Sequence, residues 1–401
     1  MAKSYAPAPQ PLPGAANHDF DWPPSRRLVA GRASARPRSL LAEWLRGRTL
    51  YHVHALRAVA ERGLPALASW LDHVAALGCG AVLLTPIHES SNHGYDTVDA
   101  LRLDPRLGSD ADLDRFVAEC RARDVRVLFD GVFNHAGRAF RRPEWLSERT
   151  WEGHDELPTL DHDNPEVLSW AVEVACHWLD LGGDGWRFDV AYAMPRPFLR
   201  SLTTAVRTVR PDAFLFGEAI HGDYAGLARD TGLDGVTQYE LFKAIWSSLN
   251  DANLWELAWA LDRHGQFAQS FTPVTFLGNH DVNRIATNLA DPAHLELALA
   301  VLFTVPGVPC VYYGDEFGWT GAKGDGAGAD DEIRPALPES PPQHAATDQH
   351  RRWINFRRSR PWLTDAAIEV ISKTNRRLQY HVADAVVTID LDNGVQLDGF
   401  D

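Results

Sequence analysis

The stretch EVLSWAVEVACHWLDLGGDGWRFDV, residues 166–190, contains one complete step from helix to strand. From Glu166 to Leu181 the apolar residues recur with the period of an amphipathic helix. Two glycines then lead to Gly185–Val190, a short apolar run that favours a buried strand and carries a carboxylate, Asp189, near its end. The same alternation of short apolar runs and longer amphipathic segments extends along the chain on both sides of this stretch.

About eight such strand–helix units follow one another between residues 49 and 360. The strand segments are apolar enough to be buried on both faces, as in a parallel sheet covered by helices. A (β/α)₈ TIM barrel explains the number of units and the length better than an open doubly wound sheet. No GxGxxG motif follows the first strand, which argues against a dinucleotide-binding fold. We therefore predict an α/β protein built on a TIM barrel.

Composition changes divide the chain further. Residues 1–48, rich in Pro, Ala, Ser and Arg, predict a poorly ordered N-terminal extension. The barrel is expected over 49–135 and 164–360. After its third strand it is interrupted by a short excursion, 136–163, which is still longer than the usual loop between a strand and a helix. Residues 361–401 alternate with a period of two and predict a truncated C-terminal β region of roughly three strands.

The charge and the cysteines exclude several classes of function. The net charge of −15 repels phosphate backbones and disfavours nucleic-acid binding. Four widely separated cysteines form no CxxC pattern, so neither a zinc site nor a disulfide framework is expected. The start, MAKSYAPAPQPLPG, lacks the apolar core of a signal peptide, and no run of 18 apolar residues predicts a membrane span. The expectation is a reduced, cytoplasmic protein without a membrane partner.

Carboxylates recur where the predicted strands end. Asp189 ends the fourth strand, Glu218 follows the fifth, and Asp281 follows the seventh. The carboxyl ends of all strands of a barrel meet at one face, so these three side chains are expected in one cup. The residues expected beside them are His135, Arg187 and His280.

Three carboxylates in one pocket suit the hydrolysis of a glycosidic bond. One carboxylate attacks the anomeric carbon, and a protonated carboxyl group donates its proton to the departing oxygen. Like-charge neighbours help the second group to keep its proton, and Arg187 would keep Asp189 ionised. Taken singly, each acidic residue could instead be a solvated loop residue or a helix cap, and His135 and His280 with the carboxylates could bind a metal. The joint order of the motifs favours the first interpretation.

Together the motifs resemble those of the α-amylase family of glycoside hydrolases, glycoside hydrolase family 13. Within the family, the chain is most similar to intracellular cyclomaltodextrinase, neopullulanase and α-glucosidase-like members. The segments that carry the resemblance are HGYDT (93–97), DGVFNH (130–135), LPTLD (157–161), GWRFD (185–189), GEAIH (217–221), FLGNHD (276–281) and GVPCVYYGDE (307–316).

The resemblance implies a role for each catalytic position. Asp189 is the expected nucleophile, Glu218 the general acid and base, and Asp281 the residue that stabilises the distorted sugar. The family retains the α configuration, so the two carboxyl groups of Asp189 and Glu218 should lie about 5–5.5 Å apart.

The resemblance also implies substrate-binding residues. His135 and His280 would bind sugar hydroxyls, Arg187 would orient Asp189 with support from Asp130, and Tyr95 would lie flat on the sugar. Two further residues, Asp96 and Arg334, resemble a pair that binds a terminal sugar in some exo-acting relatives. We expect these two side chains to meet.

No metal or other cofactor is expected. Relatives with a longer excursion use the Asn of the DGVFNH segment to help bind calcium, but the short excursion here offers few oxygen ligands beside Asn134.

The expected substrate is a short linear or cyclic α-glucan of the maltooligosaccharide or cyclodextrin type. The alternatives are a transglycosylase with the same three carboxylates, an exo-acting oligo-1,6-glucosidase, a metal-dependent hydrolase and an inactive binding protein. Intact carboxylates argue against the last of these. The expected partner is a small oligosaccharide, with self-association into a homo-oligomer left open.

Overall fold

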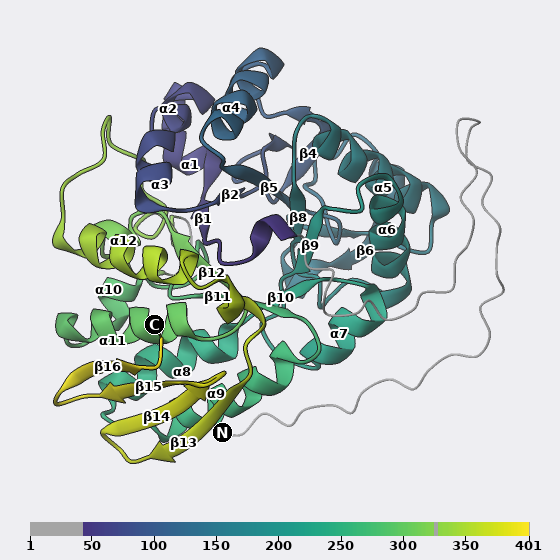
Figure 1. Cartoon of the computed structure of the whole chain (residues 1–401). Helices are drawn as coiled ribbons and strands as arrows, with labels where there is room; N and C mark the ends of the chain where they lie inside the picture. Colours follow the sequence, from purple (N-terminus) through teal and green to yellow (C-terminus); the bar gives the residue numbers. More distant parts are fainter. Residues whose placement is uncertain (1–42, 325–327, 401) are drawn as a thin grey trace, which may run out of the picture. The chain divides into compact units, whose positions relative to one another are not determined.

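The fold was analysed in a computed structural model that describes residues 43–324 and 328–400 (Figure 1). Most of the predicted N-terminal extension, residues 1–42, lies outside the described residues.

A closed barrel of eight parallel strands forms the centre of the fold, which confirms the predicted TIM barrel. Its strands, in their order around the barrel, are β1 (Leu50–Val53), β12 (Val308–Tyr312), β11 (Thr272–Phe276), β10 (Gly235–Thr237), β9 (Phe214–Gly217), β8 (Gly185–Phe188), β5 (Arg126–Gly131) and β2 (Ala81–Leu84).

Alternate residues of each strand face the inside of the barrel. Leu50, Leu83 and Phe214 belong to a buried cluster that fills the interior, whereas Tyr51 and Val82 belong to the larger core beneath the helices. Both faces of the strands are therefore buried, which explains their nearly continuous apolar sequences.

Twelve α-helices occur in the part of the chain that the structure describes. They are α1 (Ala55–Val59), α2 (Leu64–Ala68), α3 (Leu71–Leu77), α4 (Asp110–Ala122), α5 (Pro165–Asp180), α6 (Arg196–Val209), α7 (Tyr224–Thr231), α8 (Tyr239–Asn250), α9 (Trp255–Ala268), α10 (Ile285–Asn288), α11 (Leu295–Thr304) and α12 (Ala345–Arg358).

The hydrophobic pattern predicts single helices over residues 65–77 and 240–264, and both are broken in the structure. The first break separates α2 from α3, where the Ser69 hydroxyl donates to the carbonyl of Ala66 and so competes with helical pairing. The second separates α8 from α9, where Ala252 has a φ of +46° that an α-helix cannot contain. Hydrophobic periodicity continues through both breaks and does not reveal them.

Two hairpins stand on the loops at the carboxyl ends of the barrel strands. The predicted excursion contains the first, with strands β6 (Leu146–Thr150) and β7 (Pro158–Leu160). The second, β3 (His88–Ser90) with β4 (Thr97–Leu103), follows β2 and was not expected from the sequence.

A separate antiparallel sheet follows the barrel. It has the four strands β13 (Ile368–Lys373), β14 (Arg377–Val382), β15 (Ala385–Asp390) and β16 (Gly394–Asp398), one more than the sequence predicted. Its strands contact α9 and α11, as Figure 1 shows at the C-terminal end of the chain. The sheet thus covers two barrel helices.

The short 3₁₀ helix Glu43–Leu45 lies at the amino ends of the barrel strands. Leu45 is fully buried in the interior cluster. Shortly after it, Arg48 Nη1 donates to the carbonyls of Gly80 and Asp124, which precede β2 and β5. This segment therefore closes the end of the barrel opposite to the loops described above.

All four cysteines are free thiols. Among the described helices, none combines the length and the apolar character needed to cross a membrane.

Candidate active site

Strand register brings the predicted catalytic side chains to one end of the barrel. Asp130 of β5 pairs with Arg187 of β8, and Phe188 of β8 pairs with Gly217 of β9. Asp189 and Glu218 are the next residues of these two neighbouring strands. They therefore emerge side by side at the carboxyl ends.

One guanidinium holds three carboxylates together. Arg187 Nη1 lies 2.6 Å from Asp130 Oδ2 and 3.2 Å from Asp189 Oδ1, while Arg187 Nη2 lies 2.7 Å from Glu218 Oε1. All four side chains are buried. An Arg side chain presents its donors in a fixed fork, so this contact sets the mutual positions of Asp189 and Glu218.

The turn after Asp189 is strained. Val190 has a φ of +41°, which is rare for a β-branched residue. Its backbone N–H donates to Glu218 Oε2 at 3.1 Å. The unusual conformation thus directs a backbone donor onto the carboxylate of the neighbouring strand.

The third carboxylate, Asp281, lies in the loop after β11 and is partly exposed. His280 Nε2 is 3.0 Å from Asp281 Oδ2. Arg334 Nη2 donates to Asp281 Oδ1 at 3.0 Å, and Arg334 Nε donates to the backbone carbonyl of His280 at 2.7 Å. Arg334 therefore supports both the carboxylate and the loop that carries it.

Burial raises the pKa of several carboxyl groups in this cluster. The pKa of Asp189 is raised well above its ordinary value by burial, an effect that Arg187 opposes. Burial also raises the pKa of Asp281, with a further contribution from Glu218. The pKa of Asp130 is raised to about 6 by burial despite its bond to Arg187.

Four buried histidines surround the carboxylates and remain uncharged. Burial lowers the pKa of His52 and of His135 to about 3 and lowers those of His54 and His280 well below the ordinary value. Each neutral imidazole offers one donor and one acceptor. His135 Nε2 lies 4.0 Å from Asp189 Oδ2.

Tyr95 joins the cluster from the β3–β4 hairpin. Its hydroxyl donates to Asp130 Oδ2 at 2.9 Å and lies 2.6 Å from His280 Nε2. The rings of Tyr95 and His280 are stacked, with centroids 5.3 Å apart. The hairpin thus contributes an aromatic face beside the carboxylates.

Asp96 and Arg334 do not form the expected ion pair. Arg334 Nη2 pairs instead with Asp281 and, at 2.9 Å, with Oδ2 of Asp330, four residues earlier. Asp96 accepts hydrogen bonds from the Asn92 side chain and the His93 backbone. Asp96 and Arg334 therefore each have nearby partners, and an ion pair between them would gain little.

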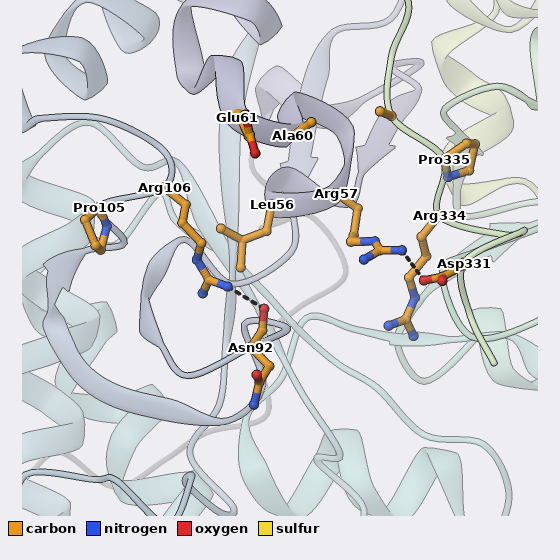
Figure 2. A pocket seen from close by; sticks show the side chains of 11 residues that line it. Leu56, Arg57, Ala60, Glu61, Asn92, Pro105, Arg106, Asp331, Arg334 and Pro335 are labelled. Atoms are coloured by element: carbon orange, nitrogen blue, oxygen red, sulfur yellow. Dashed lines mark hydrogen bonds and ion pairs between the residues drawn. The ribbon is translucent and has the colours of Figure 1, made fainter. Parts of the chain in front are cut away.

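A pocket of about 650 Å³ opens beside Arg334 (Figure 2). Its wall comes from the segments after β1, β2 and β12. In Figure 2 the Arg57 and Asp331 side chains point toward one another across it and form an ion pair, and Arg106 reaches the backbone oxygen of Asn92.

The cations of this pocket are all paired. Arg57 pairs with Asp331 and Arg106 with Asp104, as Arg334 does with its two carboxylates. Because these cations are already neutralised, the wall suits a neutral, hydroxyl-rich ligand better than an anion.

Three tryptophans, Trp145, Trp151 and Trp319, lie in loops after barrel strands, and of these Trp151 contacts a site residue. Its ring stacks on His135 with centroids 5.2 Å apart and an interplanar angle of 18°. Trp145 is buried against Phe140 and Trp170. Trp319 packs against Phe317 and Tyr313.

Four residues of the site were missed by the sequence analysis: His52, His54, Tyr239 and Asn279. Tyr239 donates to Glu218 Oε1 at 2.9 Å and accepts from Asn279 Nδ2 at 2.9 Å. His52 and His54 have T-shaped contacts with His280. The signal for His54 was available, because it ends the first predicted strand as the carboxylates end the others.

Among the described residues, no group of three or more His, Cys, Asp or Glu side chains has the arrangement of a metal site. Asn134 is buried, and its amide nitrogen is 3.2 Å from His135 Nδ1.

Comparison with known proteins places this barrel among the glycoside hydrolases. The family described as alpha amylase, catalytic domain, matches residues 63–152 and 138–368. The chain therefore belongs to the alpha-amylase family.

Individual relatives agree with this assignment. The chain is 31% identical over 292 residues to a cyclomaltodextrinase of a Bacillus species, a match that covers 64% of this chain and 52% of the relative. It is 32% identical over 291 residues to neopullulanase 2 of Thermoactinomyces vulgaris, covering 63% and 49%. This chain thus spans about half the length of the curated relatives it matches.

A solved structure matches over most of its own length. The cyclic alpha-maltosyl-(1→6)-maltose hydrolase of Arthrobacter globiformis, in complex with maltose, superimposes with a TM-score of 0.79 and 29% identity. The match covers 87% of this chain and 92% of that one.

Proposed function

We propose that the protein is a retaining α-glucoside hydrolase that cleaves short linear or cyclic α-glucans. The observation that carries the proposal is the contact of one guanidinium, that of Arg187, with both Asp189 and Glu218. It holds two carboxylates at neighbouring strand ends, as a double displacement requires. The names of the relatives, which include cyclomaltodextrinase and neopullulanase, support the substrate class.

The reaction takes two steps. In the first, an oxygen of Asp189 attacks the anomeric carbon while the glycosidic C–O bond breaks and Glu218 gives its proton to the departing oxygen. In the second, Glu218 takes a proton from water, whose oxygen displaces Asp189 from the sugar. Arg187 favours the ionised form of Asp189 that the first step needs, against the effect of burial.

Asp281 and the neutral histidines complete the site in this proposal. Asp281 binds sugar hydroxyls and stabilises the positive charge that develops on the ring. His135 and His280 each form single hydrogen bonds with sugar hydroxyls. Because both imidazoles are neutral, they add no positive charge that would oppose the charge developing on the ring.

The pocket in Figure 2 supports an oligosaccharide substrate. It lies over β1, β2 and β12, and β9, which carries Glu218, is four positions away from β1 in either direction around the barrel. The departing part of the substrate must face Glu218, so the pocket receives the part that stays attached to the reacting sugar. The enzyme is therefore expected to cleave within chains or rings faster than it removes single terminal sugars.

A cytoplasmic location forms part of the proposal. It is supported by a relative named intracellular maltogenic amylase from Bacillus subtilis, 28% identical over 289 residues, which covers 64% of this chain.

Chromatography of the products from a substrate panel tests the function. The panel contains maltose, maltotriose, maltohexaose, isomaltose, panose, sucrose, trehalose and cyclodextrins. We expect hydrolysis of maltohexaose or of cyclodextrins, with α-anomeric products. Longer products at high substrate concentration would identify a transglycosylase instead, and the absence of cleavage of every member would refute the proposal.

A further inference from the structure

A partly buried chain of hydrogen bonds reaches Glu218 from the loops after β10 and β11. We propose that Tyr239 is a positioning residue for Glu218, whose phenol stabilises the carboxylate that forms when Glu218 releases its proton. This inference rests on the proposed function, in which Glu218 is the acid and then the base.

The direction of the chain is set at its far end. The backbone N–H of Asp281 donates to Asn279 Oδ1 at 2.8 Å, which fixes the orientation of the Asn279 amide. Asn279 Nδ2 then donates to Tyr239 Oη at 2.9 Å. Because the phenol oxygen accepts this bond, its own proton points to Glu218 Oε1, 2.9 Å away.

Packing holds the phenol in place. Tyr239 is the first residue of α8, and its ring packs edge-on against Phe276 and Phe242, with centroid distances of 5.0 and 6.5 Å. Burial, together with the charge of Glu218, raises the pKa of Tyr239 well above its ordinary value. The phenol therefore remains a donor over the working pH range.

Several charged or titratable groups face Glu218 from the surrounding elements. They are Asp130 of β5, Arg187 of β8, Asp189 and Tyr192 after β8, Tyr239 after β10 and Asp281 after β11.

Among these groups, the two side chains that donate to the carboxylate are Arg187 and Tyr239. Arg187 divides its charge between Glu218, Asp130 and Asp189. The single proton of Tyr239 serves Glu218 alone. The phenol is therefore the side-chain donor dedicated to this group.

The hydrogen bond from Tyr239 favours proton transfer from Glu218 to the substrate. A donor stabilises the ionised form of a carboxyl group relative to its protonated form. As the proton of Glu218 moves to the glycosidic oxygen and the C–O bond breaks, negative charge develops on the carboxylate. The bond from Tyr239 strengthens during this step, which lowers the barrier for leaving groups that need a proton.

Tyr239→Phe tests the inference, because the ring keeps its packing and only the hydroxyl is lost. We expect kcat/KM for maltotriose to fall roughly ten- to a hundredfold, the range for losing a hydrogen bond to a charged group. For 4-nitrophenyl α-maltoside, whose leaving group departs without a proton, kcat/KM should change little.

The pH profile gives a second readout. Without the donor, Glu218 holds its proton to higher pH, so the alkaline limb of kcat/KM should move upward. The acidic limb belongs to Asp189, which Tyr239 does not contact, and should stay in place.

Tyr51→Phe is the matched control. It also removes a buried phenol–carboxylate bond, from Tyr51 Oη to Glu316 Oε1 at 2.5 Å, but on the helix-facing side of β1. It should leave the substrate ratio and both limbs unchanged. A Tyr239→Phe enzyme that is folded by circular dichroism and keeps its alkaline limb would overturn the inference.

Should Tyr239→Phe not fold, Asn279→Ala decides the question. It removes the bond that orients the phenol, and we expect the alkaline limb to move in the same direction by a smaller amount. An unmoved limb would overturn the inference. A wild-type protein that cleaves no α-glucan would instead refute the proposed function, so the two failures are distinguishable.

Discussion

At the scale of single residues, the site depends on carboxylates kept in different environments. Asp189 and Glu218 share Arg187, but only Glu218 also accepts from Tyr239 and from the backbone of Val190. Asp281 pairs with a different arginine, Arg334. Such differences in environment allow acidic groups of one pocket to take separate roles.

Removing either reacting carboxylate should abolish turnover with little loss of stability. We expect Asp189→Ala and Glu218→Gln each to lower kcat on maltohexaose by at least about two to four powers of ten. The first variant removes the covalent step and the second removes the proton transfer. Added azide should restore part of the activity of Glu218→Ala on 4-nitrophenyl α-maltoside. A near-normal rate for Asp189→Ala or Glu218→Gln would contradict the assigned roles.

A buried carboxyl outside the site should make stability depend on pH. Burial raises the pKa of Asp315 from 3.8 to about 7, although Arg284 opposes the shift. The folded protein therefore keeps a proton there that the unfolded chain has released. The stabilisation is complete below about pH 4 and is lost as the pH rises through 7, by at most about 1.4 kcal/mol per pH unit.

Urea denaturation of Asp315→Asn between pH 4 and 8 measures this contribution. We expect the free energy of unfolding to depend less steeply on pH in the variant than in the wild type. Asp348→Asn, at an exposed position of α12, is the matched control and should preserve the wild-type slope. Parallel slopes for Asp315→Asn and the wild type would show that Asp315 is not responsible.

The sequence was sufficient to predict the carboxylates at the strand ends, but not the side chains that form hydrogen bonds or ion pairs with them. Asp189, Glu218 and Asp281 could be placed because a parallel barrel gathers its carboxyl ends at one face. Tyr239 and Asn279 were missed because their roles depend on distances between different loops. The pairing of Arg334 with Asp281 was missed for the same reason, since several carboxylates lie within its reach.

At the scale of elements, α12 supplies hydrogen-bond donors to the buried carboxyl end of α11. Arg357 of α12 is fully buried, and its guanidinium donates to the carbonyls of Phe303, Val305 and Gly307 at 3.2, 2.7 and 2.5 Å. The last carbonyls of a helix have no partner within the helix, so this side chain replaces a cap. Burial lowers its pKa to about 9.

Arg357→Met should therefore destabilise the fold without altering the site. We expect a loss of about 3 kcal/mol or more, because buried carbonyls left without donors cost ~1–3 kcal/mol each. Thermal and urea denaturation measure the loss. Arg358→Met, the exposed neighbour in the same helix, should be nearly neutral, and equal effects of the two variants would contradict the proposed capping.

The elements themselves were predicted best where burial is strongest. All eight barrel strands were expected, because both of their faces are apolar. The breaks between α2 and α3 and between α8 and α9 were missed, since local backbone geometry and not hydrophobic pattern produces them. The β3–β4 hairpin was missed because β3 has only three residues and both strands are partly polar.

At the scale of the whole molecule, three segments far apart in the sequence enclose one pocket. Arg57, Arg106 and Asp331 approach it from the segments that follow β1, β2 and β12. The ion pair between Arg57 and Asp331 links the first of these segments to the last. In the proposed function, the length of substrate that the barrel accepts thus depends on all three segments together.

Filling this pocket should shorten the accepted substrate. Ala336 lines the pocket and is exposed, so a larger side chain can be introduced without disturbing the core. We expect Ala336→Trp to lower kcat/KM for maltohexaose about tenfold, equivalent to ~1.4 kcal/mol of lost contacts. The rate on 4-nitrophenyl α-glucoside, which has one sugar before the bond, should be unchanged.

Ala336→Ser provides the control for the substitution itself and should act like the wild type on both substrates. Equal losses on the long and the short substrate with Ala336→Trp would indicate damage to the carboxylate cluster. No loss on either would show that the substrate does not enter the pocket.

The closure of the barrel by Leu45 has a practical consequence. This residue and Arg48 lie against the amino ends of the strands, whereas the carboxylates occupy the carboxyl ends. Coupling the protein to a bead or an electrode through this end of the barrel would leave the face with the carboxylates turned to the liquid. Truncation beyond Leu45 would expose the apolar interior of the barrel to water, so an immobilised protein should keep the segment from Glu43 to Arg48.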